Sequence, residues 1–105
     1  MKIRISNDEI RVRLSKADME KLLSENTIVT SISLPPQTLT FSVYVDRLET
    51  APWVDMKNHH CKIALPETLA DKWKENRREV ISFQQVGPFE TSLTVKIELD
   101  LKSAD

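Results

Sequence analysis

His59, His60 and Cys61 are the residues whose types and spacing come closest to a chemical site. Imidazole and thiolate groups are ligands for zinc and copper, and in a strand His59 and Cys61 would share one face. A complete site needs further ligands, and the nearest carboxylate in the sequence is that of Asp55. The sequence predicts instead that Cys61 is a core residue and that both histidines lie at a turn. The alternative is a metal site that uses His59 and Cys61.

The same residues also suggest a nucleophile and a base. Cys61 could act as the nucleophile, with His59 or His60 taking its proton. Residues one or two positions apart on a strand rarely reach each other in that geometry, so we expect no enzymatic activity. Gly87 is the only glycine of the chain, which excludes the glycine-rich loops that bind phosphates and dinucleotides. We therefore expect no cofactor.

Charge on the first predicted hairpin offers a different chemistry, which is binding. A two-residue turn at Asn7 and Asp8 would place four cations on one outward face: Lys2, Arg4, Arg11 and Arg13. Like charges directly opposite each other destabilise a strand pair, so something must compensate them. The interpretation we favour is pairing with Glu98 and Asp100, which lie on the outward face of the last predicted strand. The alternative is an anionic partner, either a nucleic-acid backbone or an acidic protein surface.

Tryptophan side chains supply two further candidates. Trp53 follows Pro52 beside the predicted linker, and aromatic residues are enriched at binding hot spots. Trp53 is therefore a candidate binding residue. Trp73 falls at the position that Leu22 has in the first half of the chain, so we expect it in the core.

The elements that position these residues occur twice. Apolar residues of the first half return 51 positions later, as from Leu14 to Leu65, and beyond the next turn the offset becomes 54, as from Leu39 to Leu93. Each copy reads as strand, strand, helix, strand, strand. The sequence thus predicts an α+β fold, either a β-rich small barrel or a two-layer sheet, built from this duplicated unit. We expect a single domain over residues 1–105, with repeats at 1–46 and 52–101 joined by a linker at 46–52.

Composition limits the classes of function. The chain has 105 residues, of which 30% are charged, and a net charge of −1, which is ordinary globular composition without a basic field. Nucleic acid is therefore a partner that composition does not favour. No apolar run is long enough to span a membrane, no signal peptide precedes the first strand, and Cys61 has no second cysteine to pair with. We expect a cytoplasmic protein that makes no membrane contact.

Two resemblances add to this interpretation. The run from Ile63 to Trp73, in which an apolar strand ends in Leu-Pro and enters a helix, resembles the AbrB/MazE-type swapped-hairpin domains. This resemblance implies a small barrel in which hairpins of the two halves interleave, and DNA binding as a function. The opening Met1 to Ile5, with the alternation from Ile10 to Leu14, is similar to a family of short uncharacterised bacterial proteins.

Together these features indicate a small non-enzymatic binding or interaction module. Its candidate binding residues are Lys2, Arg4, Arg11, Arg13 and Trp53, and its expected partner is a protein or another anionic molecule. One alternative is an AbrB-like DNA-binding regulator or antitoxin-like protein. Another is a small metal- or thiol-dependent protein that uses His59, His60 and Cys61. The sequence leaves the oligomeric state open.

Overall fold

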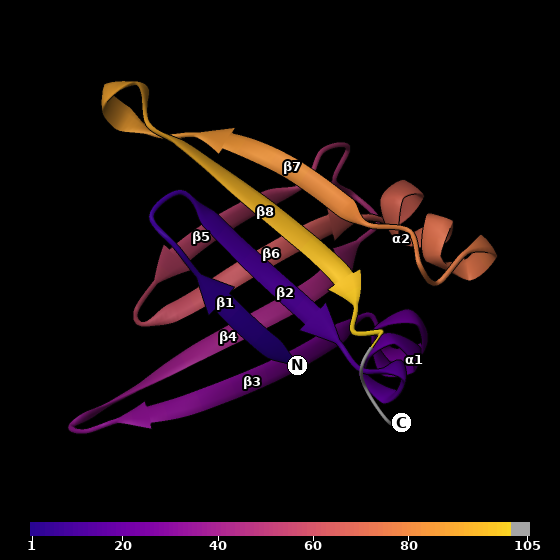
Figure 1. The fold of residues 1–105 in the computed structure, drawn as a ribbon, viewed down its shortest axis with the longest axis horizontal. Coiled ribbons are helices and arrows are strands. Elements are labelled where there is room, and N and C mark those ends of the chain that lie inside the picture. Colours follow the sequence, from indigo (N-terminus) through magenta and orange to yellow (C-terminus); the bar gives the residue numbers. More distant parts are fainter. Residues whose placement is uncertain (102–105) are drawn as a thin grey trace.

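The computed structural model describes residues 1–101, which form eight strands and two α-helices (Figure 1). The first half contains β1 (Lys2–Ile5), β2 (Glu9–Leu14), α1 (Lys16–Glu25), β3 (Thr27–Leu34) and β4 (Gln37–Asp46). The second half contains β5 (Trp53–Lys57), β6 (His60–Pro66), α2 (Glu67–Glu75), β7 (Ile81–Val86) and β8 (Ser92–Leu99). A short 3-10 helix, Pro88–Glu90, lies between β7 and β8. The predicted order of strand, strand, helix, strand, strand is confirmed for both halves.

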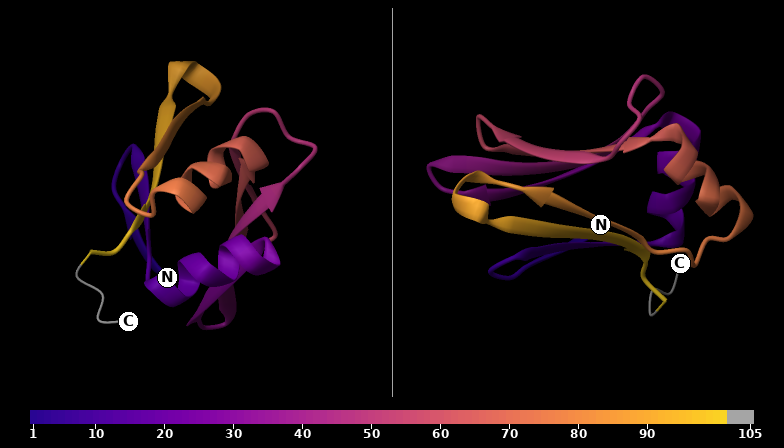
Figure 2. Two further views of the ribbon diagram at one scale, coloured as in Figure 1. Left: turned by 90° about the vertical axis from the view of Figure 1, so that its right-hand side faces the viewer. Right: turned by 90° about the horizontal axis from the view of Figure 1, so that it is seen from above.

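The strands form two four-stranded mixed sheets, and each sheet combines one hairpin from each half. Sheet A has the order β1-β2-β8-β7, and sheet B has the order β3-β4-β6-β5. The two central strands of each sheet run parallel, β2 with β8 and β4 with β6, whereas each edge strand is antiparallel to its neighbour. The sheets lie as two open layers (Figure 2). Of the two architectures that the sequence predicted, the structure has the two-layer sheet and not the closed barrel.

Both helices lie at one end of the two layers (Figures 1 and 2). Helix α1 begins with a capping box, because Ser15 Oγ accepts a bond of 3.0 Å from the Asp18 N–H and the Asp18 carboxylate accepts one of 3.2 Å from the Ser15 N–H. The helix ends at Asn26, whose backbone is left-handed (φ 66°). Proline is favoured at the first helical position, where its missing N–H needs no partner, so the sequence predicts Pro66 as the first helical residue of α2. It is instead the last residue of β6, because its backbone stays extended (ψ 148°) where it pairs with Asp46 of β4.

The core lies between the sheets and beneath the helices. The largest fully buried side chain is Trp73, whose Nε1–H donates a bond of 2.7 Å to the Glu79 carbonyl. Cys61 is 2% exposed. Both core predictions are therefore confirmed. The other buried apolar residues come from both halves: Val12, Leu14, Met19, Leu22, Ile28, Phe41, Val43, Val54, Ile63, Ala64, Leu65, Ala70, Ile81, Val95 and Ile97.

The two layers meet along two seams, which are closed differently. At the seam between β5 and β7, Gln85 Nε2 donates a bond of 2.7 Å to the Val54 carbonyl, and Gln85 Oε1 accepts one of 2.9 Å from the Val54 N–H. The repeat places Leu34 and Ile3 at the equivalent positions of the seam between β1 and β3. A leucine side chain cannot form these bonds. This second seam remains open as a groove of about 380 Å³.

The hairpin of β3 and β4 extends beyond the core. The alternation of residues 27–34 predicts one inner face for Ile28, Ile32 and Leu34, and the regular pairing of β3 places them on one face. Only Ile28 is buried, whereas Ile32 and Leu34 are each 53% exposed. The hairpin extends past β1, the nearest strand of sheet A, so its outer end has no opposing layer (Figure 1).

Within residues 1–101, neither helix has the length and apolar character that a membrane-spanning helix needs.

Candidate functional site

The first hairpin brings the predicted cations together. Lys2 lies opposite Arg13 and Arg4 lies opposite Arg11, while Ile5 lies opposite Ile10 on the inner face. The predicted register is therefore confirmed. It follows from the short turn, in which the Ser6 N–H donates a bond of 3.0 Å to the Glu9 carbonyl.

Strand β8 adds further charges to this surface. Its parallel register with β2 places Lys96 beside Arg11 and Glu98 beside Arg13. Because side chains on one face of a sheet lie side by side, Arg4, Arg11 and Lys96 form a continuous row across β1, β2 and β8. The name charged face is used below for the following residues: Lys2, Arg4, Glu9, Arg11, Arg13, Lys96, Glu98 and Asp100.

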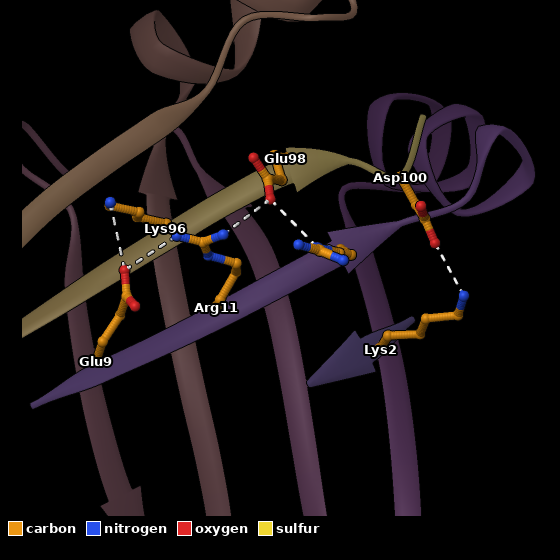
Figure 3. A network of polar contacts seen from close by, with 7 residues as sticks. Lys2, Glu9, Arg11, Lys96, Glu98 and Asp100 are labelled. Atoms are coloured by element: carbon orange, nitrogen blue, oxygen red, sulfur yellow. Dashed lines mark hydrogen bonds and ion pairs between the residues drawn. The ribbon is translucent and has the colours of Figure 1, made fainter. Parts of the chain in front are cut away.

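Carboxylates in β8 and directly after it compensate most of the cations of the first hairpin (Figure 3). Glu98 Oε1 lies 3.3 Å from Arg13 Nε and 3.9 Å from Arg11 Nη1. Asp100, which is 8% exposed, accepts a bond of 2.9 Å from Lys2 Nζ. The favoured interpretation, that Glu98 and Asp100 pair with the basic hairpin, is therefore confirmed.

Glu9 compensates the middle of the row. Its Oε1 lies 3.5 Å from Arg11 Nη2 and 3.4 Å from Lys96 Nζ, so that one carboxylate lies between two cations (Figure 3). Arg11 is thus held from both sides, by Glu9 and by Glu98. Its buried Nε has no hydrogen-bond partner within the described part of the chain.

Arg4 is the cation that this compensation does not reach. It is exposed on the edge strand β1, and within residues 1–101 no ion pair or side-chain hydrogen bond involves it. The charged face as a whole has five cations and three carboxylates. It therefore has two excess positive charges, although the net charge of the chain is −1. The chemistry that this arrangement offers is recognition of an anion.

Comparison with protein families shows a match over the whole chain. The model described as "Family of unknown function (DUF7009)" covers residues 1–105. The chain belongs to this family. No curated protein matches the chain, and no solved structure does. Membership in a family of unknown function is consistent with the expectation of an uncharacterised family.

Trp53 of this DUF7009 chain lies away from the charged face. It occupies β5 on sheet B, where it is half-buried and meets Tyr44 edge-to-face with ring centroids 5.9 Å apart. Lys2, Arg4, Arg11 and Arg13 all lie on sheet A. The structure thus brings the four basic candidates together and separates them from Trp53.

The metal candidates of the DUF7009 chain also lie apart. His59 is exposed in the turn before β6, with a left-handed backbone (φ 63°), whereas the Cys61 side chain is buried. His60 Nε2 lies 2.8 Å from the hydroxyl of the buried Ser42. Burial, and secondarily the charge of Asp55, raise the pKa of the Cys61 thiol. No cluster of three or more His, Cys, Asp or Glu side chains that could hold a metal ion is found in residues 1–101.

Two members of the charged face were missed from sequence. Lys96 lies two residues before Glu98 and therefore on the same outward face of β8, so the alternation of that strand could have predicted it. Glu9 precedes the alternating run at Ile10, and nothing in the sequence links it to Lys96. That link depends on the parallel pairing of β2 with β8, which joins residues from opposite ends of the DUF7009 chain.

Proposed function

We propose that the protein is a non-enzymatic binding module that contacts an anionic partner through the charged face. The observation that supports this function is the row Arg4, Arg11 and Lys96, whose outermost member is exposed and unpaired among the described residues. Arg11 is fixed by Glu9 and Glu98, so part of its side-chain entropy is already lost before a partner binds. A partner carboxylate or phosphate would meet one free guanidinium at the edge of a prearranged row.

Arg4 is the informative position for a test of this function. Arg11→Glu or Arg13→Glu would place a carboxylate against Glu98 and disturb the fold, whereas Arg4→Glu breaks no ion pair present in the structure. The matched control is Lys57→Glu, which changes the net charge equally on the exposed surface of sheet B.

The experiment compares elution from a heparin column, which presents a dense array of anions. We expect the Arg4→Glu protein to elute at clearly lower salt than the Lys57→Glu protein, because only the former loses a cation of the charged face. In a pull-down, the Arg4→Glu bait should lose its physiological partner and the Lys57→Glu bait should keep it. Equal elution of the two variants would show that heparin responds to net charge alone, and the proposed surface would be wrong.

A second candidate function is DNA binding of the AbrB/MazE type. Support for it comes from the interleaved hairpins, since each sheet joins a hairpin of one half to a hairpin of the other, as the resemblance at Ile63 to Trp73 implies. The repeat weighs against a symmetric DNA site, because Arg11 and Arg13 correspond to Lys62 and Ala64 in the second copy, so the basic surface belongs to one half of the chain. Titration of a random DNA duplex over a series of salt concentrations distinguishes the two candidates. Binding to DNA should weaken steeply, with a log–log slope of about −0.9 for each phosphate contacted.

We also propose a cytoplasmic location, which rests on the single unpaired cysteine of the chain. The similarity of the opening residues to short bacterial proteins supports a bacterial origin. Fractionation of cells that express the tagged chain tests the location.

A further inference from the structure

The hairpin of β3 and β4 has no charged residue before Asp46, the last residue of β4. Residues 27–45 contain no Asp, Glu, Lys or Arg, in a chain of which 30% is charged. Exposed apolar side chains gather on it: Val29 is 58% exposed, and Ile32 and Leu34 are each 53% exposed. Natural edge strands are commonly protected by charges, prolines or bulges. The edge strand β3, which is eight residues long, has no charge and no proline.

The free edge of β3 has hydrogen-bonding groups available for a further strand. The Val45 N–H donates a bond to the Asn26 carbonyl, and bonded pairs alternate along an antiparallel pair of strands. The even-numbered residues of β3 therefore form the backbone hydrogen bonds with β4. The N–H and C=O groups of Val29, Ser31 and Ser33 consequently point away from β4, toward the open side of sheet B. A strand added there would find three donors and three acceptors in a row.

An apolar groove lies directly beside this edge. It is the open seam between β1 and β3, about 380 Å³ in volume and lined mainly by Ile3, Ile5, Ile32, Leu34, Leu39 and Phe41. A strand paired with β3 would direct every second side chain toward this groove. Alternating apolar residues are therefore what the added strand needs, together with the absence of charge.

We propose that the strand that pairs with β3 is the β3 strand of a second copy of this chain. The copy meets both requirements, because its own β3 is uncharged and alternates Ile28, Thr30, Ile32 and Leu34 on the inner face. Antiparallel pairing about a two-fold axis joins sheet B of both copies into one sheet of eight strands and places inner-face residues beside the groove of the other chain. No charge is buried, since Lys2 and Arg4 lie on the outer face of sheet A. This inference does not depend on the charged face.

The size of the contact predicts a reversible dimer. A strand of eight residues is about 26 Å long, and two packed layers with their side chains are about 20 Å across. The product, about 500 Å² for each chain, is an upper value, because the outer end of β3 has no opposing layer. The total of about 1,000 Å² lies near the lower limit for specific interfaces. The proportion of dimer should therefore depend on protein concentration over the range accessible to sedimentation.

Two serine positions, related by the repeat, provide a matched test. Ser31 and Ser82 lie 51 positions apart, both are exposed, and both are on uncharged edge strands, β3 and β7. The Gly87 N–H donates a bond to the Thr91 carbonyl, so the odd-numbered residues of β7 form the backbone hydrogen bonds with β8. The N–H of Ser82 therefore also points to a free edge. Proline at either position removes a free-edge donor without breaking a bond within the sheet. Ser31→Ala, which loses only the hydroxyl, is the control for the contact between Ser31 Oγ and Thr40 Oγ1.

Sedimentation equilibrium measures the mass of each protein. We expect the wild-type, Ser31→Ala and Ser82→Pro proteins to approach the mass of two chains as concentration rises, and Ser31→Pro to keep the mass of one chain. If both proline variants are monomeric, β3 pairs with β7 of another copy, and the two-fold dimer is wrong. If neither variant is monomeric, the dimer uses another surface, and the proposal is equally wrong.

Amide hydrogen exchange of the wild-type protein tests the same contact without a mutation. The amides of Val29, Ser31 and Ser33 should exchange more slowly at high than at low protein concentration, while those of Ser82 and Gln84 should not change. A wild-type protein that stays monomeric, and whose β3 amides exchange freely at all concentrations, overturns the proposal. Exchange in the presence of phosphatidylcholine vesicles would then show whether the groove accepts lipid instead.

Discussion

Gln85 closes one seam of the molecule, and its replacement should show how much that closure stabilises the fold. The informative change is Gln85→Leu, because leucine is close to glutamine in size and is the residue that the repeat has at position 34. The substitution removes both bonds between the Gln85 side chain and the Val54 backbone, which are 2.7 and 2.9 Å long. It leaves the apolar contacts of the seam largely in place.

The expected loss follows from these two bonds. Each hydrogen bond contributes about 0.5–1.5 kcal/mol net, so the pair contributes about 1–3 kcal/mol. Val54 is 7% exposed, so water cannot readily replace both lost bonds. Burial of the leucine side chain returns part of the loss. We expect the free energy of unfolding to fall by about 2 kcal/mol. Each kcal/mol shifts the Tm by about 4–8 °C in a domain of 60–100 residues, so the Tm should fall by about 8–16 °C.

Thermal and urea unfolding, followed by circular dichroism, measure this loss. The control is Gln84→Leu, at the adjacent residue, whose exposed side chain forms no hydrogen bond within residues 1–101. A surface change of this kind should alter the free energy of unfolding by less than about 0.5 kcal/mol. If the two variants lose the same stability, the Gln85 bonds do not hold the seam, and the contrast between the two seams has no energetic meaning.

Two further predictions concern the core. Leu14→Ala and Leu65→Ala should each lower the free energy of unfolding by about 2–5 kcal/mol, because both leucines are fully buried. Each variant should keep a single unfolding transition, because the two halves share both sheets. Two separate transitions in urea would show that the halves are independent domains. Cys61 should react slowly with a thiol reagent in the native protein and rapidly in denaturant, because burial raises the pKa of the thiol and blocks access to it; rapid native labelling would favour the metal- or thiol-dependent alternative.

Local features of the fold were accessible from the sequence. The turn at Asn7 and Asp8 determined the register of the first hairpin, and the capping box at Ser15 determined the start of α1. These features depend on neighbouring residues only, so a local pattern is sufficient to predict them. Pro66 was misplaced by one residue because its extended conformation is stabilised by β4, which is distant in sequence.

Non-local features were less accessible. The carboxylate of Glu98 was expected near the basic hairpin, but the parallel register that places it beside Arg13 has no local signal. The exposure of Ile32 and Leu34 has the same origin, because the alternation of β3 indicates an inner face without indicating how far the opposing sheet extends. The open groove between β1 and β3 therefore could not be predicted.

The exchange of hairpins between the halves has a consequence for biosynthesis. Strand β2 cannot find its parallel neighbour until β8 has left the ribosome, since contacts such as that of Arg13 with Glu98 join residues 85 positions apart. Contacts of such high sequence separation slow folding. In the earlier part of that interval, after β4 and before β6 has been synthesised, the hairpin of β3 and β4 also lacks its neighbour β6. During translation the nascent chain therefore has two unpaired strand edges in its first half, which is the period in which it is most exposed to aggregation and most in need of chaperones.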